Sequence, residues 1–77
     1  MKDKLGNKLE IGDILFNPYA LDYWVVSSRY NEELDKDELY IKLVKTDYDE
    51  DIEIAVSFFK VGSIYDIAII GEDKEWI

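Results

Sequence analysis

The residues that bear chemistry are concentrated between Asn31 and Glu53. This stretch holds ten carboxylates against only three lysines, in a chain of 77 residues with a net charge of -9. Carboxylates act as general acids and bases, hold hard metal ions, or bind cationic partners. Their spacing and surroundings decide which of these chemistries is expected here.

Asp47, Asp49 and Asp51 alternate, as the first ligands of an EF-hand calcium loop do. Counted from Asp47, however, Ile52 stands where the turn glycine belongs and Phe58 where the bidentate glutamate belongs. The pattern therefore indicates a solvated hairpin turn, and we expect no metal and no cofactor.

Catalysis is not expected either. The chain has no histidine and no cysteine, so a serine nucleophile has no customary base beside it. Acid-base work by paired carboxylates needs two environments that separate their pKa values, and exposed loop acids lack them. The four glycines are isolated and form no phosphate-binding loop. We therefore expect a protein that binds rather than an enzyme.

The elements that must position the acids show a hydrophobic period of two. With 48% apolar residues the chain is expected to fold despite its charge. The alternation predicts a mostly β protein, a small five-stranded SH3-like or OB-like barrel that forms one domain over residues 1–77. Its strands are expected over residues 9–16, with a bulge at Gly12, and over residues 22–30, 39–44, 52–58 and 64–70.

Residues 31–38 carry signals for both a loop and a helix start. We interpret them as a loop, with one short helical turn as the alternative, because an Asn cap followed by Glu32 and Glu33 favours a helix start. In a meander, this segment and the turn near residues 46–51 lie at opposite ends of the sheet. The acids therefore need not form one patch. A barrel this small is only about 20 Å across, which is two to three Debye lengths at physiological salt, so the two clusters could still act as one negative field.

The segment Asp3-Lys4-Leu5-Gly6-Asn7-Lys8-Leu9-Glu10-Ile11-Gly12-Asp13-Ile14 resembles the opening hairpin of small phage and prophage proteins with SH3-like barrels, including the YopX-like family. Those openings read roughly Asp-x-x-Gly-x-x-apolar-x-x-Gly-Asp-apolar. Residues 59–65 are similar to a later apolar-Gly-Asn-Ile-Tyr segment, but Ser63 replaces the Asn. The resemblance implies a mobile-element origin and an SH3-like fold, and it carries over no catalytic residue.

Charge and aromatic residues together predict a protein-binding function. The net charge disfavours direct contact with nucleic acid or membrane, since both depend on Lys and Arg. If residues 47–51 form a strand, same-face carboxylates lie about 6.7 Å apart, a spacing that suits mimicry of phosphates. Tyrosine and tryptophan are favoured binding anchors. Trp24 and Tyr40 are expected in core or sheet packing, whereas Tyr48 and Trp76 are expected to be exposed.

We therefore expect a cytoplasmic inhibitor of phage origin, of the anti-CRISPR or DNA-mimic type, that binds a basic host protein. This host protein is expected to bind nucleic acid or to act in defence. Absence of an apolar run at the start supports the cytoplasmic location. The alternative is a structural accessory domain that self-associates through a strand edge, so either a monomer or a homodimer is expected. The candidate partner-binding residues are Glu32, Glu33, Asp35, Asp37, Asp47, Tyr48, Asp49, Glu50, Asp51 and Trp76.

Overall fold

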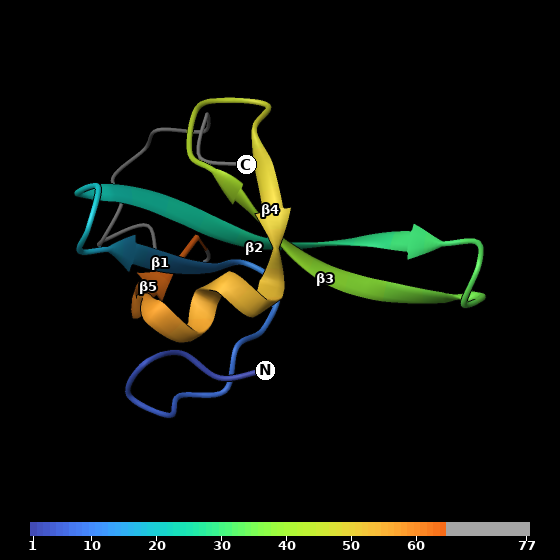
Figure 1. Cartoon of the computed structure of the whole chain (residues 1–77), viewed down its shortest axis with the longest axis horizontal. Coiled ribbons are helices and arrows are strands. Elements are labelled where there is room, and N and C mark those ends of the chain that lie inside the picture. The colour runs from blue at the N-terminus through green and yellow to red at the C-terminus, as the bar shows by residue number, and fades with distance from the viewer. Residues whose placement is uncertain (65–77) are drawn as a thin grey trace.

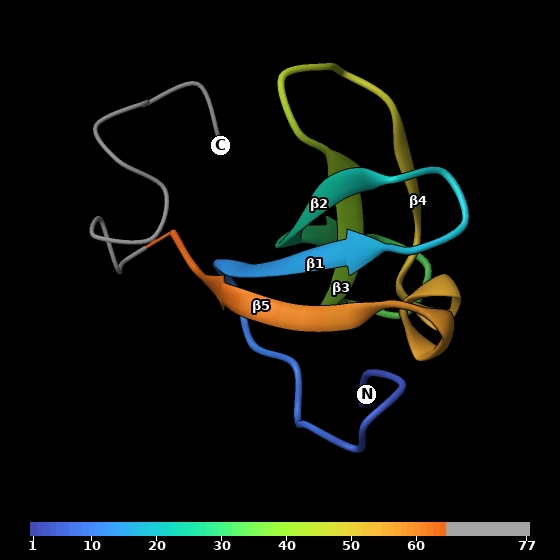
Figure 2. The ribbon, with the colours of Figure 1, turned by 90° about the vertical axis from the view of Figure 1, so that its left-hand side faces the viewer.

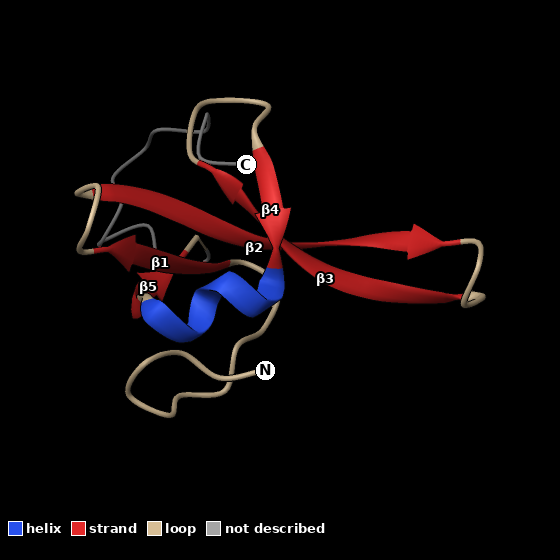
Figure 3. Ribbon diagram, viewed as in Figure 1, coloured by secondary structure: helices blue, strands red, loops and turns tan. Residues whose placement is uncertain are grey.

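One antiparallel sheet organises the chain (Figure 1). The computed structural model describes residues 1–64, and Figure 3 shows that strands predominate there. The prediction of a mostly β protein is confirmed. The elements are β1 (Asp13–Asn17), β2 (Asp22–Asn31), β3 (Lys36–Leu43), β4 (Asp49–Asp51), the 3-10 helix η1 (Ile52–Ser57) and β5 (Phe59–Ser63).

The strand order is β4-β3-β2-β1-β5. The first four strands follow one another as hairpins, and η1 then carries the chain back so that β5 pairs with β1. In Figure 2, β1 and β5 run across the direction of β3 and β4, so the sheet is strongly twisted. Within residues 1–64, β4 and β5 remain the two edges of this sheet, and no ladder joins them into a closed barrel.

The main hydrophobic cluster lies on one face of the sheet, whereas the fully buried Ile14 and Val25 pair with each other on the other face. Trp24 and Val26 of β2 are opposite Leu43 and Ile41 of β3, and this alternation puts them all on the same side. The Trp24 ring packs against Phe58, with ring centroids 5.9 Å apart. The buried members of the cluster are Leu9, Leu15, Trp24, Val26, Ile41, Ile52, Ala55 and Phe58.

The predicted strand over residues 52–58 is wrong, because residues 52–57 form η1. Ile52 and Ala55 are buried, whereas Ile54 and Val56, expected on the same face as Ile52, are exposed. The buried positions Ile52, Ala55 and Phe58 recur every three residues, which is the period of a 3-10 helix. The fourth strand is instead β4, inside the segment interpreted as a turn.

The first predicted strand begins too early. Gly12 lies in a turn with a φ of +93°, and β1 starts only at Asp13. The predicted bulge at Gly12 is wrong for the same reason. A bulge occurs instead in β5, because Ile14 pairs with Gly62 and Leu15 with Lys60, which leaves Val61 without a partner in the register. The predicted strand over residues 64–70 falls outside the described residues except for Ile64, which lies in a turn.

The loop interpretation of residues 31–38 is correct only for the turn itself, and no helix forms there. Residues 32–35 turn between β2 and β3, and both strands extend further than expected. The Asn31 side-chain oxygen accepts hydrogen bonds from the backbone N–H groups of Glu33 (3.0 Å) and Leu34 (3.4 Å). This Asx turn competes with helix formation. The β2–β3 hairpin therefore projects as a long arm (Figure 1).

The opening motif forms a clamp, defined here as the hydrogen bonds by which the Asp3 side chain holds the N-terminal loop against β5. Asp3 is buried, and its carboxylate accepts hydrogen bonds from Leu5 N, Asn7 N and Asn7 Nδ2 within its own loop. It also accepts one from Lys60 N of β5 at 2.8 Å. Gly6 completes the turn with a φ of +84°, a conformation that favours glycine. These bonds fasten the N-terminal loop to the edge of the sheet.

Candidate binding surface on the outer face of β3 and β4

β4 is an edge strand made entirely of acidic residues. Asp49 is opposite Lys42 and Asp51 is opposite Tyr40, whereas Glu50 is opposite Ile41, which belongs to the core. Because side chains alternate along a strand, Asp49 and Asp51 share the outer face of the sheet, away from the core. Their Cα atoms are separated by two strand steps, about 6.7 Å.

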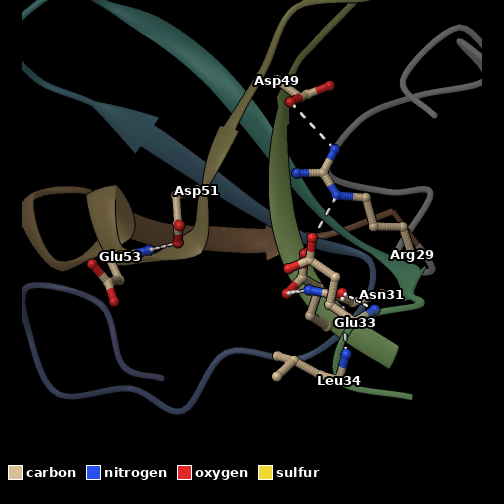
Figure 4. Close-up of polar contacts among 8 residues, drawn as sticks. Arg29, Asn31, Glu33, Leu34, Asp49, Asp51 and Glu53 are labelled. Atoms are coloured by element: carbon tan, nitrogen blue, oxygen red, sulfur yellow. Dashed lines mark hydrogen bonds and ion pairs between the residues drawn. The ribbon is translucent and has the colours of Figure 1, made fainter. Parts of the chain in front are cut away.

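Arg29 of β2 reaches across β3 toward Asp49 on this outer face (Figure 4). Its Nη1 lies 3.5 Å from Asp49 Oδ1, and its Nε lies 3.8 Å from Glu38 Oε1. Its guanidinium carbon lies 4.4 Å from the centre of the Tyr40 ring, within cation–π range. The arginine thus joins β2, β3 and β4. All three charged side chains are 38–48% exposed, so these long ion pairs are weak and easily exchanged.

A groove of about 320 Å³ opens beside Arg29. Its acidic walls are Glu38, Asp51 and Glu53, and Tyr40 and Ile52 supply ring and aliphatic surface. Three carboxylates against one guanidinium leave these side chains with a net negative charge. The full lining is Met1, Arg29, Glu38, Leu39, Tyr40, Asp51, Ile52 and Glu53.

Asp51 also fixes the end of the groove. Its side chain accepts a hydrogen bond from Glu53 N at 3.1 Å and thereby caps η1 (Figure 4). This cap holds the start of η1 directly after β4, so Asp51 and Glu53 both line the groove. Sequence reasoning had placed Asp51 in a turn.

Tyr48 and Glu50 lie at the same edge but face the core side. The Tyr48 ring meets Trp24 edge-on, with centroids 5.8 Å apart, although 54% of the residue is exposed. Its hydroxyl donates a hydrogen bond to Glu50 Oε1. That bond and the charges of Glu50 and Asp49 raise the pKa of the Tyr48 hydroxyl above its ordinary value. The predicted exposure of Tyr48 is confirmed, although one side of its ring contacts Trp24.

The hairpin acids, defined as Glu32, Glu33, Asp35 and Asp37, are all exposed and lie at the opposite end of β3. Along β3, Asp37 lies three strand steps, about 10 Å, from Tyr40, the residue opposite Asp51, and five steps, about 17 Å, from Lys42, the residue opposite Asp49. These separations correspond to about one to two Debye lengths at physiological salt. Tyr30 donates a hydrogen bond to Asp35, and this bond raises the pKa of the Tyr30 hydroxyl. The structure thus divides the predicted site residues into two groups.

The second group comprises the β4 acids, defined as Asp47, Asp49, Glu50 and Asp51, together with Tyr48. Asp47 is exposed in the loop before β4. Trp76 lies outside the described residues.

Sequence reasoning missed the basic and aromatic partners of the acids. Arg29 is the single arginine of the chain, and Tyr40 was expected only to pack. Arg29 alternates with Ser27 and Asn31, so these three residues indicate a polar face of β2. That pattern was the available signal. Glu38 and Glu53 were counted among the acids but were not singled out as site residues.

Comparison with known proteins gives no match: no family model, no curated protein and no solved structure matches the chain. Residues 1–64 include no helix with the length and apolar character needed to cross a membrane. In the same part of the chain, no three or more carboxylates gather in a way that would hold a metal ion.

Proposed function

We propose that this chain is a non-enzymatic binding domain that recognises a basic protein through the β4 acids and the adjoining groove. The observation that carries the proposal is the outer face of β3 and β4, where Glu38, Asp51 and Glu53 line a groove with a single guanidinium. Asp49 lies beside it on the same face, in contact with Arg29. Cationic side chains of a partner complement this surface.

The acids stand where a partner can reach them. Asp49, Asp51 and Glu53 are exposed. Within residues 1–64, Asp49 and Glu38 are held only by the long contacts of Arg29 and, for Glu38, by a 3.1 Å hydrogen bond from Asn31. Displacement of Arg29 by a cation of the partner loses little free energy, because exposed ion pairs contribute about 0–1 kcal/mol. Negative charge at this edge also steers a basic partner during encounter.

In its narrower form, the partner is a host protein that binds nucleic acid or acts in defence. The spacing of Asp49 and Asp51 supports competition with phosphates for a basic cleft. The resemblance of residues 3–14 to phage proteins supports a mobile-element origin and an inhibitory, anti-CRISPR type of role in the cytoplasm. The hairpin acids do not line the groove, so the proposed mimic is assigned to the β4 end.

Self-association through a strand edge receives less support. Pairing β4 with its copy would put acidic side chains opposite one another, which is unfavourable. At the other edge, Lys60 N of β5 already donates to Asp3. Both edges are thus protected in the ways by which sheet proteins commonly avoid such pairing.

The test compares two variants that each lose three negative charges. Asp49→Asn, Glu50→Gln and Asp51→Asn remove charge from the β4 end, and Glu32→Gln, Glu33→Gln and Asp35→Asn remove it from the hairpin. Immobilised wild type and both variants are exposed to bacterial lysate at low and high salt, with mass spectrometry of the bound proteins.

We expect a basic nucleic-acid-binding protein that is retained at low salt by wild type and by the hairpin variant, and lost from the β4 variant. Equal retention by both variants, or equal loss from both, would refute a site at β4.

A further inference from the structure

The outward edge of β4 presents unpaired backbone groups. Leu43 N donates to Tyr48 O at 2.9 Å, so Leu43 and Tyr48 form a hydrogen-bonded pair. Hydrogen-bonded and non-bonded pairs alternate in an antiparallel ladder, so Glu50 and Ile41 form the next hydrogen-bonded pair. The backbone N–H and C=O of Glu50 therefore point toward β3. The N–H and C=O of Asp49 and the N–H of Asp51 therefore point away from the sheet. No strand within residues 1–64 pairs with them.

We propose that β4 receives an extended basic segment of the partner protein as an added strand. This inference rests on the proposed function and specifies how the basic partner is held. The outward groups of Asp49 and Asp51 supply three main-chain hydrogen bonds, which is the mode of β-strand addition. The charges of the edge select a basic occupant and disfavour a second copy of this chain.

The register assigns the positions of the cationic side chains. A partner residue whose backbone faces Asp49 has its side chain on the same face as Asp49, about 4.5–5.5 Å across the pair. The residue two positions away then lies beside Asp51, at the groove that Tyr40 and Glu53 also line. The expected ligand is a strand with Lys or Arg at alternate positions. The first cation of this strand competes for the Asp49 carboxylate with Arg29, whose Nη1 lies 3.5 Å from Asp49 Oδ1.

The probe is a short fluorescein-labelled peptide that alternates lysine and threonine, titrated with the full chain at low salt and followed by fluorescence anisotropy. Its control carries the same charge but has methyl groups on the backbone nitrogens of the lysines. When lysine lies opposite Asp49, the backbone N–H groups of the lysines point toward β4. Methylation removes the donors and obstructs strand pairing, without altering the side chains.

The second part of the experiment substitutes Asp49 in the protein. Asp49→Asn removes the charge and keeps the outward N–H, whereas Asp49→Pro removes the charge and the N–H. Proline is tolerated at an edge position whose N–H faces outward. The difference between the two variants therefore measures the backbone bond. Circular dichroism and amide spectra verify that both variants fold, and the methylated peptide tests the same bond on the unaltered protein.

We expect the methylated peptide to bind at least about tenfold more weakly, and Asp49→Pro to bind about threefold to tenfold more weakly than Asp49→Asn. Equal affinity of both peptides for wild type would overturn strand addition and leave the proposed acidic binding surface standing. If neither peptide binds at low salt, the proposed function fails together with the inference.

Discussion

At the scale of single residues, Asp3 shows how a buried carboxylate stays charged. Burial by itself would raise its pKa, but the hydrogen bonds from Asn7, Lys60 and Leu5 outweigh this effect and lower the pKa below the ordinary value. The carboxylate is thus a fixed acceptor for three backbone donors. This role accounts for Asp3 in the opening motif without any contact to a partner.

Asp3→Ala leaves these donors without their acceptor, and we expect the free energy of unfolding to fall by about 1–3 kcal/mol. Urea denaturation followed by tryptophan fluorescence measures the change. Asp47→Ala, in an exposed loop, is the matched control and should change it by less than about 0.5 kcal/mol. Similar losses in the two variants would contradict the clamp.

The stabilisation by Asp3 should depend on pH in one direction. A carboxyl whose pKa is lower in the folded than in the unfolded state stabilises the fold above the unfolded value, about 3.9, and loses this contribution as pH falls through the folded value. The difference in unfolding free energy between wild type and Asp3→Ala should therefore be constant near neutral pH and shrink below about pH 4. A difference that grows on acidification would have the wrong sign.

Tyr48 gives the corresponding prediction at alkaline pH. Its raised pKa, due mainly to the hydrogen bond and charge of Glu50, means that the neutral hydroxyl is favoured in the folded state. The contribution is present below about pH 10 and lost as pH rises through the folded value. In Glu50→Gln, tyrosinate absorbance should appear at lower pH than in wild type, whereas an unchanged titration curve would show that the contact is not made.

At the scale of elements, η1 is where the hydrophobic period indicates a strand and the observed burial does not. Ile52, Ile54, Val56 and Phe58 alternate with less apolar residues, so the segment has the pattern of a half-buried strand. The Asp51 cap and the three-residue spacing of Ile52, Ala55 and Phe58 decide for a 3-10 helix instead. This turn allows β5 to return to β1.

A 3-10 helix and a strand over this segment predict different losses of unfolding free energy when single side chains are truncated. In η1, Ile52 is buried and Ile54 is partly exposed, so Ile52→Ala should destabilise by about 2–4 kcal/mol and Ile54→Ala by less than about 1 kcal/mol. A strand with both residues on its buried face would give similar losses. Chemical denaturation of the two variants under identical conditions makes the comparison.

At the scale of the whole molecule, the sequence predicted the mostly β fold class, because period-two alternation suffices for it, and left open whether the acids converge on one face. It did not predict β4, since three consecutive acids carry no strand pattern and are placed only by the register of β3. Nor did it reveal the role of Arg29, because the contacts to Glu38 and Asp49 need three strands in place.

Protection of both sheet edges predicts a monomer. Sedimentation velocity over a wide range of protein concentration should give a constant sedimentation coefficient at physiological salt. Asp49→Thr with Asp51→Thr removes the like charges from β4 and adds residues that favour strands, so this variant is the one expected to self-associate. A wild type that dimerises as its concentration rises would favour the accessory-domain alternative.

The most direct test of the central claim is an amide NMR titration of the isotope-labelled chain with the lysine–threonine peptide at low salt. We predict that shifts concentrate on Asp49, Glu50, Asp51 and the neighbouring Arg29 and Tyr40, and that they disappear at high salt. The hairpin acids serve as an internal control because they lie at the far end of β3. Shifts confined to the hairpin, or spread evenly over all acidic residues, would contradict a binding surface at β4.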